Sequence, residues 1–157
     1  MKRLALKVGA AVLAAMIVRR LRRHLHHGGH EDAARAYFDA WSDGDGDAIR
    51  DLVSDDYQAH VHTLEGTDER DADELVLVVE SHAGAFSQVD YDLHEVISHN
   101  GCVAVRATMH ACHQETGKDG EIDGIAILRF DGDRIAEEWS SWDYLDLAGQ
   151  LGLSGGE

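Results

Sequence analysis

Two groups of ionisable side chains in this sequence have positions that can support chemistry. His113 continues an alternating apolar run, so it places an imidazole on an otherwise apolar strand face. Glu137 and Glu138 are neighbours in a later strand, so one of the two must face the interior. A glutamate buried beside the nearby Trp139 can act as a general acid or base near neutral pH. The candidate catalytic residues are therefore His113 and Glu138.

Each candidate also has a purely structural interpretation. His113 can be a hydrogen-bonded core histidine, and a strand glutamate can simply be solvated at a sheet edge. His60 and His62 share a strand face and could supply two metal ligands, but the spacing does not indicate a third. The sequence contains no dinucleotide-binding, phosphate-loop or nucleophile-elbow motif. We therefore expect neither a metal nor a cofactor.

The elements that must position these side chains follow from the hydrophobic periodicity. Three helices are predicted: one over 31–42, a short one with its N-cap at Asp47, and one over 71–86. Strands are predicted over 57–63, 89–93, 102–114, 122–130 and 134–142. Helices followed by a strand meander indicate an α+β fold, with the three helices packed on a curved, mostly antiparallel sheet. This cone-shaped arrangement, a cystatin-like roll, leaves a pocket between the sheet and the helices.

Charge divides the chain into a basic tail, residues 1–30, and an acidic body, residues 31–157. The tail contains seven of the 14 basic residues and none of the 30 acidic ones. Its formal charge is therefore +7, whereas that of the body is −23. A body of this charge repels nucleic acid, so we expect no nucleic-acid partner for it.

The tail has the composition of a membrane-surface anchor. An apolar run over 8–18 precedes an arginine cluster at 19–23. As a helix, residues 4–18 would cover about 22 Å, which is short of the ~30 Å hydrocarbon core. We expect residues 1–23 to associate with a membrane surface, with a disordered start or docking to a partner as the alternatives.

The two cysteines indicate the compartment. Cys102 and Cys112 lie in one predicted strand, where ten residues span about 33 Å, so they cannot pair with each other. Unpaired cysteines are typical of a reducing compartment. We expect a cytoplasmic protein, membrane-associated only through its tail.

Three segments resemble one known family. Residues 37–45 read YFDAWSDGD, residues 56–60 read DYQAH, and residues 132–145 read GDRIAEEWSSWDYL, followed by QLG at 150–152. In this order and spacing they resemble the SnoaL-like polyketide cyclases of the nuclear transport factor 2-like superfamily. The resemblance covers residues 31–153.

That resemblance implies a reaction, but one residue of this sequence differs from the family's pattern. The family's cyclases close a ring by an intramolecular aldol reaction without metal or cofactor, using an aspartate and a nearby histidine. His113 falls where the family's pocket histidine sits, whereas Ala126 stands where the catalytic aspartate should be. A methyl group cannot accept a proton, which shifts the expectation from catalysis towards binding. The resemblance also implies a homodimer formed through the sheet.

We therefore expect residues 31–157 to bind a small, largely apolar, oxygenated molecule. The first alternative is a cofactor-independent cyclase, isomerase or epoxide-hydrolase-like enzyme that uses His113 and a pocket carboxylate. The second is a non-catalytic dimeric scaffold tethered at a membrane. The expected pocket lining consists of Tyr37, Trp41, Tyr57, His60, Met109, Ala126 and Trp139.

The charge of the body favours a halophilic protein over an ordinary acidic one. Self-repulsion at this density is tolerable only where salt screens it, and the Debye length falls from about 10 Å at 0.1 M to about 3 Å at 1 M. We predict that the melting temperature rises between low and molar KCl, as measured by circular dichroism. A melting temperature that did not rise would favour the ordinary acidic protein.

Overall fold

A single curved sheet of six strands organises the residues that the computed structural model describes, which are 29–63 and 66–153. The elements in chain order are α2 His30–Asp43, α3 Gly46–Leu52, β1 Val53–Thr63, β2 Gly66–Arg70, α4 Ala72–Ala85, β3 Phe86–His99, β4 Cys102–His113, β5 Asp119–Asp131, β6 Arg134–Trp142 and α5 Tyr144–Leu151. Residues 1–28 of the predicted tail, including the expected membrane anchor at 1–23, lie outside the described residues. None of the helices in the described ranges is long and apolar enough to cross a membrane.

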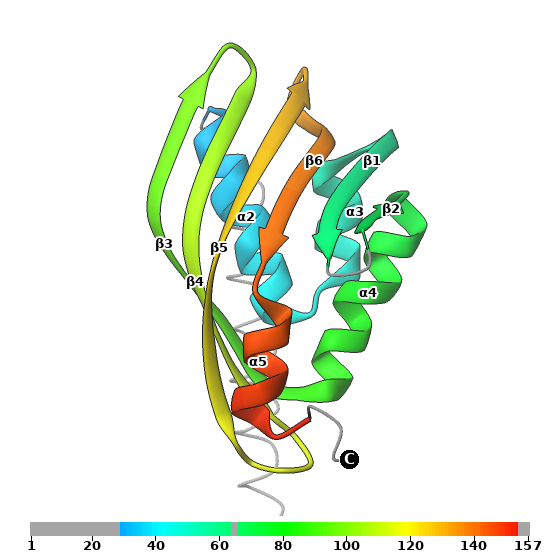
Figure 1. Cartoon of the computed structure of the whole chain (residues 1–157). Coiled ribbons are helices and arrows are strands. Elements are labelled where there is room, and N and C mark those ends of the chain that lie inside the picture. The colour runs from blue at the N-terminus through cyan, green and yellow to red at the C-terminus, as the bar shows by residue number, and fades with distance from the viewer. Residues whose placement is uncertain (1–28, 64–65, 154–157) are drawn as a thin grey trace, which may run out of the picture.

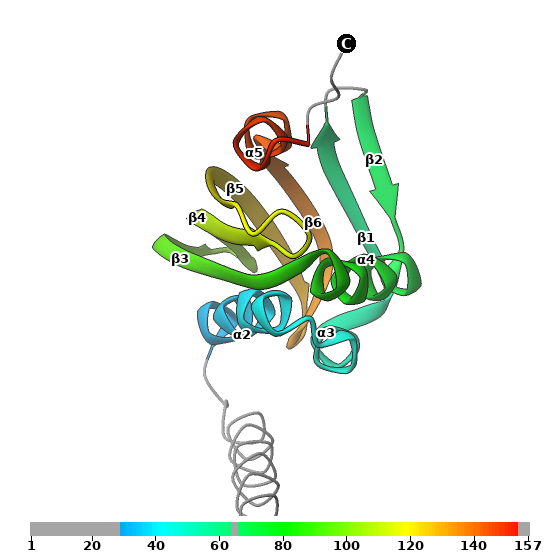
Figure 2. The ribbon, with the colours of Figure 1, turned by 90° about the horizontal axis from the view of Figure 1, so that it is seen from below.

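The strand order is β2-β1-β6-β5-β4-β3, and every neighbouring pair is antiparallel except β1 with β6. The helices α2 and α3 lie along one face of this sheet, and α4 lies beside β1 and β2 (Figure 1). Viewed at right angles, the sheet curves around the side that carries these helices (Figure 2). The predicted α+β architecture with a curved, mostly antiparallel sheet is confirmed.

The prediction differs from the structure in three elements. The N-cap of α3 is Asp45, not Asp47, because the Asp45 side chain accepts a hydrogen bond from the Ala48 amide at 2.9 Å. Strand β2 was not expected, since its five residues show no apolar alternation and only Arg70 is even partly buried. Helix α5 was not expected either. It begins at an Asp143 N-cap whose side chain accepts from the Asp146 amide.

Period-two burial along the strands fixes which side chains reach the interior. Alternate residues of β4 from Val103 to His113 are buried, and those of β5 from Ile122 to Phe130 are buried as well. Helix α2 covers this inner face with the buried residues Ala34, Tyr37, Phe38 and Ala40.

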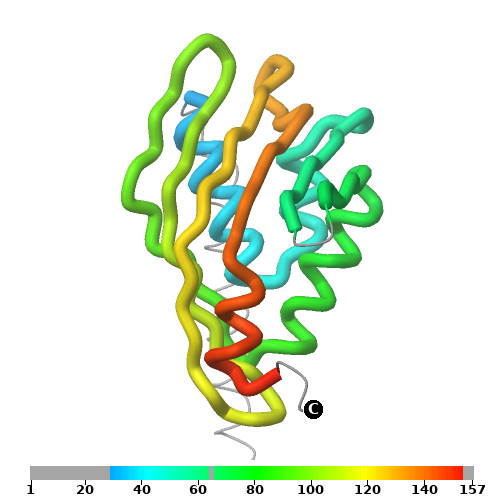
Figure 3. Tube along the Cα trace, viewed as in Figure 1, coloured from blue at the N-terminus to red at the C-terminus, as the bar shows by residue number. Residues whose placement is uncertain are grey.

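The C-terminal helix closes the lower end of the sheet. The hairpin between β4 and β5 curls beneath α5, as the yellow and red segments of Figure 3 show. Helix α5 packs closely on β5 at Gly120, where an added Cβ would lie 2.8 Å from a Leu147 methyl carbon. Because Gly120 has no side chain, Leu147 and Leu151 can pack with Met109 and Ile122 in a second core cluster.

Gly124 provides a test of the packing between β5 and the end of β6. It pairs with Trp142 across β5 and β6, and an added Cβ would overlap the indole ring. We predict that Gly124→Val lowers the free energy of unfolding by about 1–3 kcal/mol, the usual cost of overpacking. Urea denaturation in molar KCl measures this.

The matched control is Gly149→Ala on the exposed side of α5, where an added Cβ meets nothing within 4 Å. This change should leave stability equal or raise it by up to about 1 kcal/mol, because alanine favours helix. Equal stabilities of the two variants would contradict the described packing of Trp142.

Candidate functional site

Glu138 is the carboxylate that the sheet directs into the interior. Alternation along β6 buries Glu138 and Ser140, and it turns Glu137 and Trp139 to the outer face. Glu138 is only 6% exposed. It lies between Ala59 of β1 and Leu128 of β5 in the strand register.

Two buried phenols hold one oxygen of this carboxylate. Tyr37 of α2 donates a hydrogen bond to Glu138 Oε2 at 2.6 Å, and Tyr57 of β1 donates to the same oxygen at 2.8 Å. The two phenol oxygens lie 3.3 Å apart. The other oxygen, Oε1, makes no hydrogen bond to a described residue. Within the described ranges no fully buried side-chain oxygen or nitrogen lacks a partner, so Oε1 must open on free space.

This arrangement keeps both phenols protonated. Burial raises the pKa of Tyr37 and of Tyr57 well above 10, and the negative charge of Glu138 raises both further. A protonated phenol is a hydrogen-bond donor, so the pair remains able to hold the carboxylate across the physiological pH range.

The free space beside Glu138 is a narrow interior cavity. Its lining is mostly aromatic and apolar and consists of Tyr37, Phe38, Trp41, Ala59, Val61, Arg70, Leu75, Tyr91, Glu138, Ser140, Trp142 and Tyr144. The volume is about 20 Å³, which is room for one water molecule. The cone is therefore much fuller than the sequence predicted, because Phe38, Tyr91 and Trp142 pack against one another inside it.

Tyr37 and Trp41 are the two residues of the predicted lining that border this cavity. Tyr57 does not border it, but its hydroxyl donates a hydrogen bond to Glu138, which does. Ala126 is buried on the inner face of β5, opposite Ser140 and diagonal to Glu138. Diagonal neighbours of this kind lie about 7–8 Å apart. Met109 is fully buried in the second core cluster with Leu147 and Leu151, away from the carboxylate.

His113 lies apart from the carboxylate. It is buried at the end of β4, where its Nδ1 lies 3.1 Å from the Thr116 hydroxyl and its ring contacts Phe86 edge-on. No carboxylate is within hydrogen-bonding distance of His113 among the described side chains. The predicted pairing of His113 with a pocket carboxylate is therefore absent. The reason is that β4 and β6 are separated by β5, and His113 stands at the far end of its strand.

His60 and Trp139 lie on the outer face of the sheet, so they do not line the cavity. Their rings stack with centroids 5.6 Å apart, and His60 Nε2 lies 3.0 Å from Glu137 Oε1. The strand register joins them to a row of outward-facing residues that crosses the whole sheet: Ile97, Ala104, Ile127, Trp139, His60 and Glu69.

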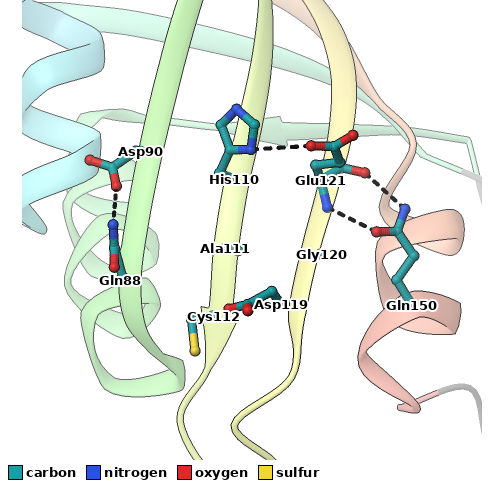
Figure 4. A pocket seen from close by; sticks show the side chains of 9 residues that line it. All are labelled: Gln88, Asp90, His110, Ala111, Cys112, Asp119, Gly120, Glu121 and Gln150. Atoms are coloured by element: carbon teal, nitrogen blue, oxygen red, sulfur yellow. Dashed lines mark hydrogen bonds and ion pairs between the residues drawn. The ribbon is translucent and has the colours of Figure 1, made fainter.

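A second concavity of about 400 Å³ lies between β3, β4, β5 and α5 (Figure 4). Figure 4 shows its polar lining, in which the His110 ring lies beside the Glu121 carboxylate. The Gln150 side chain forms hydrogen bonds with the backbone amide and carbonyl groups of Glu121. Within the described ranges no cluster of three or more histidine, cysteine or acidic side chains could hold a metal ion. This hollow carries the carboxylates of Asp90, Asp119 and Glu121, and no large aliphatic side chain is among its described lining residues.

Most of the lining was not identified from the sequence, and the missed residues include Arg70, Ser140 and Tyr144. Arg70 belongs to the unexpected strand β2, and Tyr144 to the unexpected helix α5. Ser140 shares the inner face with Glu138, so the alternation that identified one could have identified the other.

The family follows from a comparison with family models. The model described as the SnoaL-like domain matches residues 34–138. The chain belongs to the SnoaL-like family. The matched segment begins in α2 and ends at Glu138 itself, so it includes both tyrosines and the carboxylate that they hold.

Solved structures of SnoaL-like and related proteins share the fold. IdmH of Streptomyces antibioticus, a proposed polyketide cyclase, is 21% identical, with a TM-score of 0.71 over 80% of this chain and 99% of that chain. AclR of Streptomyces galilaeus, a proposed hydroxylase, is 21% identical, with a TM-score of 0.69 over 81% of this chain and 87% of that one. A proposed polyketide cyclase of Bacillus cereus is 20% identical, with a TM-score of 0.68 over 78% and 80% of the two chains. No curated protein gives a significant match.

The four tyrosines of this SnoaL-like protein provide a test of the site. Burial raises the pKa of Tyr37, Tyr57 and Tyr91 well above 10 and that of Tyr144 to about 12. An ultraviolet titration should show little tyrosinate near pH 10, where unfolded tyrosines are half ionised. The free energy of unfolding should fall as the pH rises above 10, because only the unfolded chain then releases these protons. Ionisation of Tyr37 or Tyr57 near pH 10 in the folded protein would contradict their described burial.

Proposed function

We propose that this protein binds a small, oxygenated, largely apolar molecule beside Glu138 and acts on it by proton transfer. The observation that carries the proposal is the buried carboxylate, with Oε2 held by two phenols and Oε1 free. A buried charge costs several kcal/mol of folding free energy unless it is paired, so its retention favours a role beyond stability.

Glu138 Oε1 is suited to accept a proton from a carbon next to a carbonyl group. The C–H bond breaks, its electron pair moves to form the enolate, and the proton resides on Glu138. The enolate can then be reprotonated at another carbon, or it can attack a second carbonyl of the same molecule to close a ring. Glu138 returns the proton in either case, so the reaction consumes no co-reactant and the carboxylate is regenerated.

Ser140 supplies a donor for the carbonyl oxygen. It is buried two residues from Glu138 on the same face, and its hydroxyl makes no hydrogen bond to a described residue. A donor directed at the oxygen where negative charge develops stabilises the transition state. The carboxylate of Glu138 thus replaces, from the neighbouring strand, the acid–base group that Ala126 lacks.

Entry of a ligand requires the cavity to widen. Tyr144 is 37% exposed and forms, with Trp142, the part of the wall at the junction of β6 and α5. Outward rotation of these two rings enlarges the space beside Glu138 without moving a strand. The proposal therefore includes a ring movement on binding.

Exchange of α-protons tests the proposed chemistry. The probe is 2-tetralone, an apolar bicyclic ketone, incubated with the full chain in deuterated buffer with molar KCl. Nuclear magnetic resonance should show exchange accelerated by the wild type, and Glu138→Gln should lower that acceleration by about 100-fold or more. Glutamine keeps an oxygen for the phenols to donate to but cannot accept the proton.

The matched control is Glu137→Gln, the same change one residue away on the outer face. It should retain the wild-type exchange rate. Thermal melts of both variants separate loss of folding from loss of chemistry. Exchange that is absent in the wild type, or equal in the two variants, would contradict proton transfer by Glu138.

We also propose that the outer face of the sheet pairs with a second copy of the chain. Ile127 is 43% exposed and Ile97 61% exposed in the row that crosses the sheet, and Ile125 beside them is 56% exposed. Arg106 pairs with Glu95 on one side of this row and Arg129 with Glu137 on the other. These ion pairs neutralise charge beside the apolar residues, which lowers the repulsion between two acidic bodies that approach there.

A charge in this row should prevent that pairing. We predict that Ile127→Asp shifts the protein from dimer to monomer, because the carboxylate would be buried without a partner at the interface. Sedimentation velocity in molar KCl measures the state. Leu77→Asp, at a 65% exposed residue of α4, is the control and should leave the dimer intact. A monomeric wild type, or a dimeric Ile127→Asp variant, would contradict the proposed surface.

A further inference from the structure

The register of three strands places opposite charges on either side of one alanine. Arg70 of β2 is paired with Ala59 of β1, and Ala59 is paired with Glu138 of β6. All three residues line the interior cavity. Two strand spacings amount to roughly 10 Å, so the backbones of Arg70 and Glu138 are separated by about the length of a two-ring molecule. Between the two charged residues, Ala59 contributes only a methyl group.

Arg70 retains hydrogen-bond donors for a ligand. Its Nε donates to Asp68 Oδ2 at 2.8 Å, and its Nη2 lies 2.7 Å from the same oxygen. Its Nη1 makes no hydrogen bond or ion pair to a described residue. The side chain of Asp68 is 49% exposed, whereas that of Arg70 is 22% exposed. A half-exposed ion pair contributes little free energy, so a ligand can compete with Asp68 for the guanidinium.

From this geometry we infer that the ligand carries a carboxylate that binds Arg70 while its oxygenated end lies against Glu138. The guanidinium fork matches the two oxygens of a carboxylate. Arg70 is the one basic side chain, and Glu138 the one acidic side chain, among the described residues that line the cavity. A molecule with an anionic group at one end and an enolisable carbonyl at the other fits both. This inference names the substrate class of the proposed function and rests on the same cavity.

The charge balance of the body supports a selective role for Arg70. The body carries a formal charge of −23, so an acidic ligand is repelled everywhere except where a cation meets it. The positive charge of Arg70 acts on side chains of two other elements. It lowers the pKa of His82 on α4, secondarily to burial, and it opposes the larger effect of burial on the pKa of Tyr144 on α5.

Two probes of equal shape test the inference. The full chain is titrated with 2-naphthoate and with 2-naphthamide, which differ in charge, and calorimetry gives both dissociation constants. The wild type should bind the carboxylate at least about tenfold more tightly than the amide. Arg70→Gln should abolish this preference. Arg50→Gln, an exposed arginine that pairs with Asp73 on the helical side, should retain it.

Asp68→Asn distinguishes binding from a loss of folding. It removes the present partner of Arg70, so it should tighten 2-naphthoate binding and leave 2-naphthamide unchanged, a gain that misfolding cannot produce. Failure of the wild type to bind either probe, equal affinities for the two, or a preference that survives Arg70→Gln would overturn the inference. The two tests can also give different answers. If Glu138→Gln loses α-proton exchange but Arg70→Gln keeps the preference for 2-naphthoate, the proposed function stands. Only the inference that the substrate carries a carboxylate is then wrong.

Discussion

The interior of this protein depends on keeping one carboxylate away from water. An unpaired buried carboxylate destabilises a fold by several kcal/mol, so Glu138 is compatible with the core only because Tyr37 and Tyr57 both donate to it. Those donors come from α2 and β1, whereas the carboxylate comes from β6. The hydrogen bonds therefore fix how the first helix lies across a parallel strand pair that is far apart in the chain.

The same constraint explains the full interior. Aromatic rings that surround Glu138 remove water from one of its oxygens, and the phenols replace that water with fixed dipoles. Low polarity strengthens each of these interactions, because electrostatic energies grow as the effective dielectric constant falls. A spacious apolar cone would have required the carboxylate to be hydrated or absent. The narrow cavity and the buried carboxylate thus arise from the same packing of aromatic rings around Glu138.

The two faces of the sheet carry different side chains because the pleat alternates. Glu138 and Ser140 face the cavity, whereas Glu137 and Trp139 face outward, where an exposed apolar row is bordered by paired charges. Chemistry and association can therefore change independently along one strand. Family membership fixes neither function, since a fold hosts many activities and the site alone decides among them. Here the buried carboxylate stands on β6, diagonal to Ala126 of β5.

The sequence by itself determined the class of fold, the acidic character of the body and the fact that one glutamate of the Glu137–Glu138 pair faces inward, because periodicity and charge are local properties. It did not reveal β2, whose residues lack apolar alternation, or α5, which is only eight residues long, so Arg70 and Tyr144 were unrecognised as parts of the site. It also grouped His113, His60 and Trp139 with Glu138, although strand order and pleat separate them. Only the tertiary structure decided that the partners of Glu138 are two tyrosines and, across Ala59, one arginine. Strand register depends on contacts between distant segments, which no local pattern encodes.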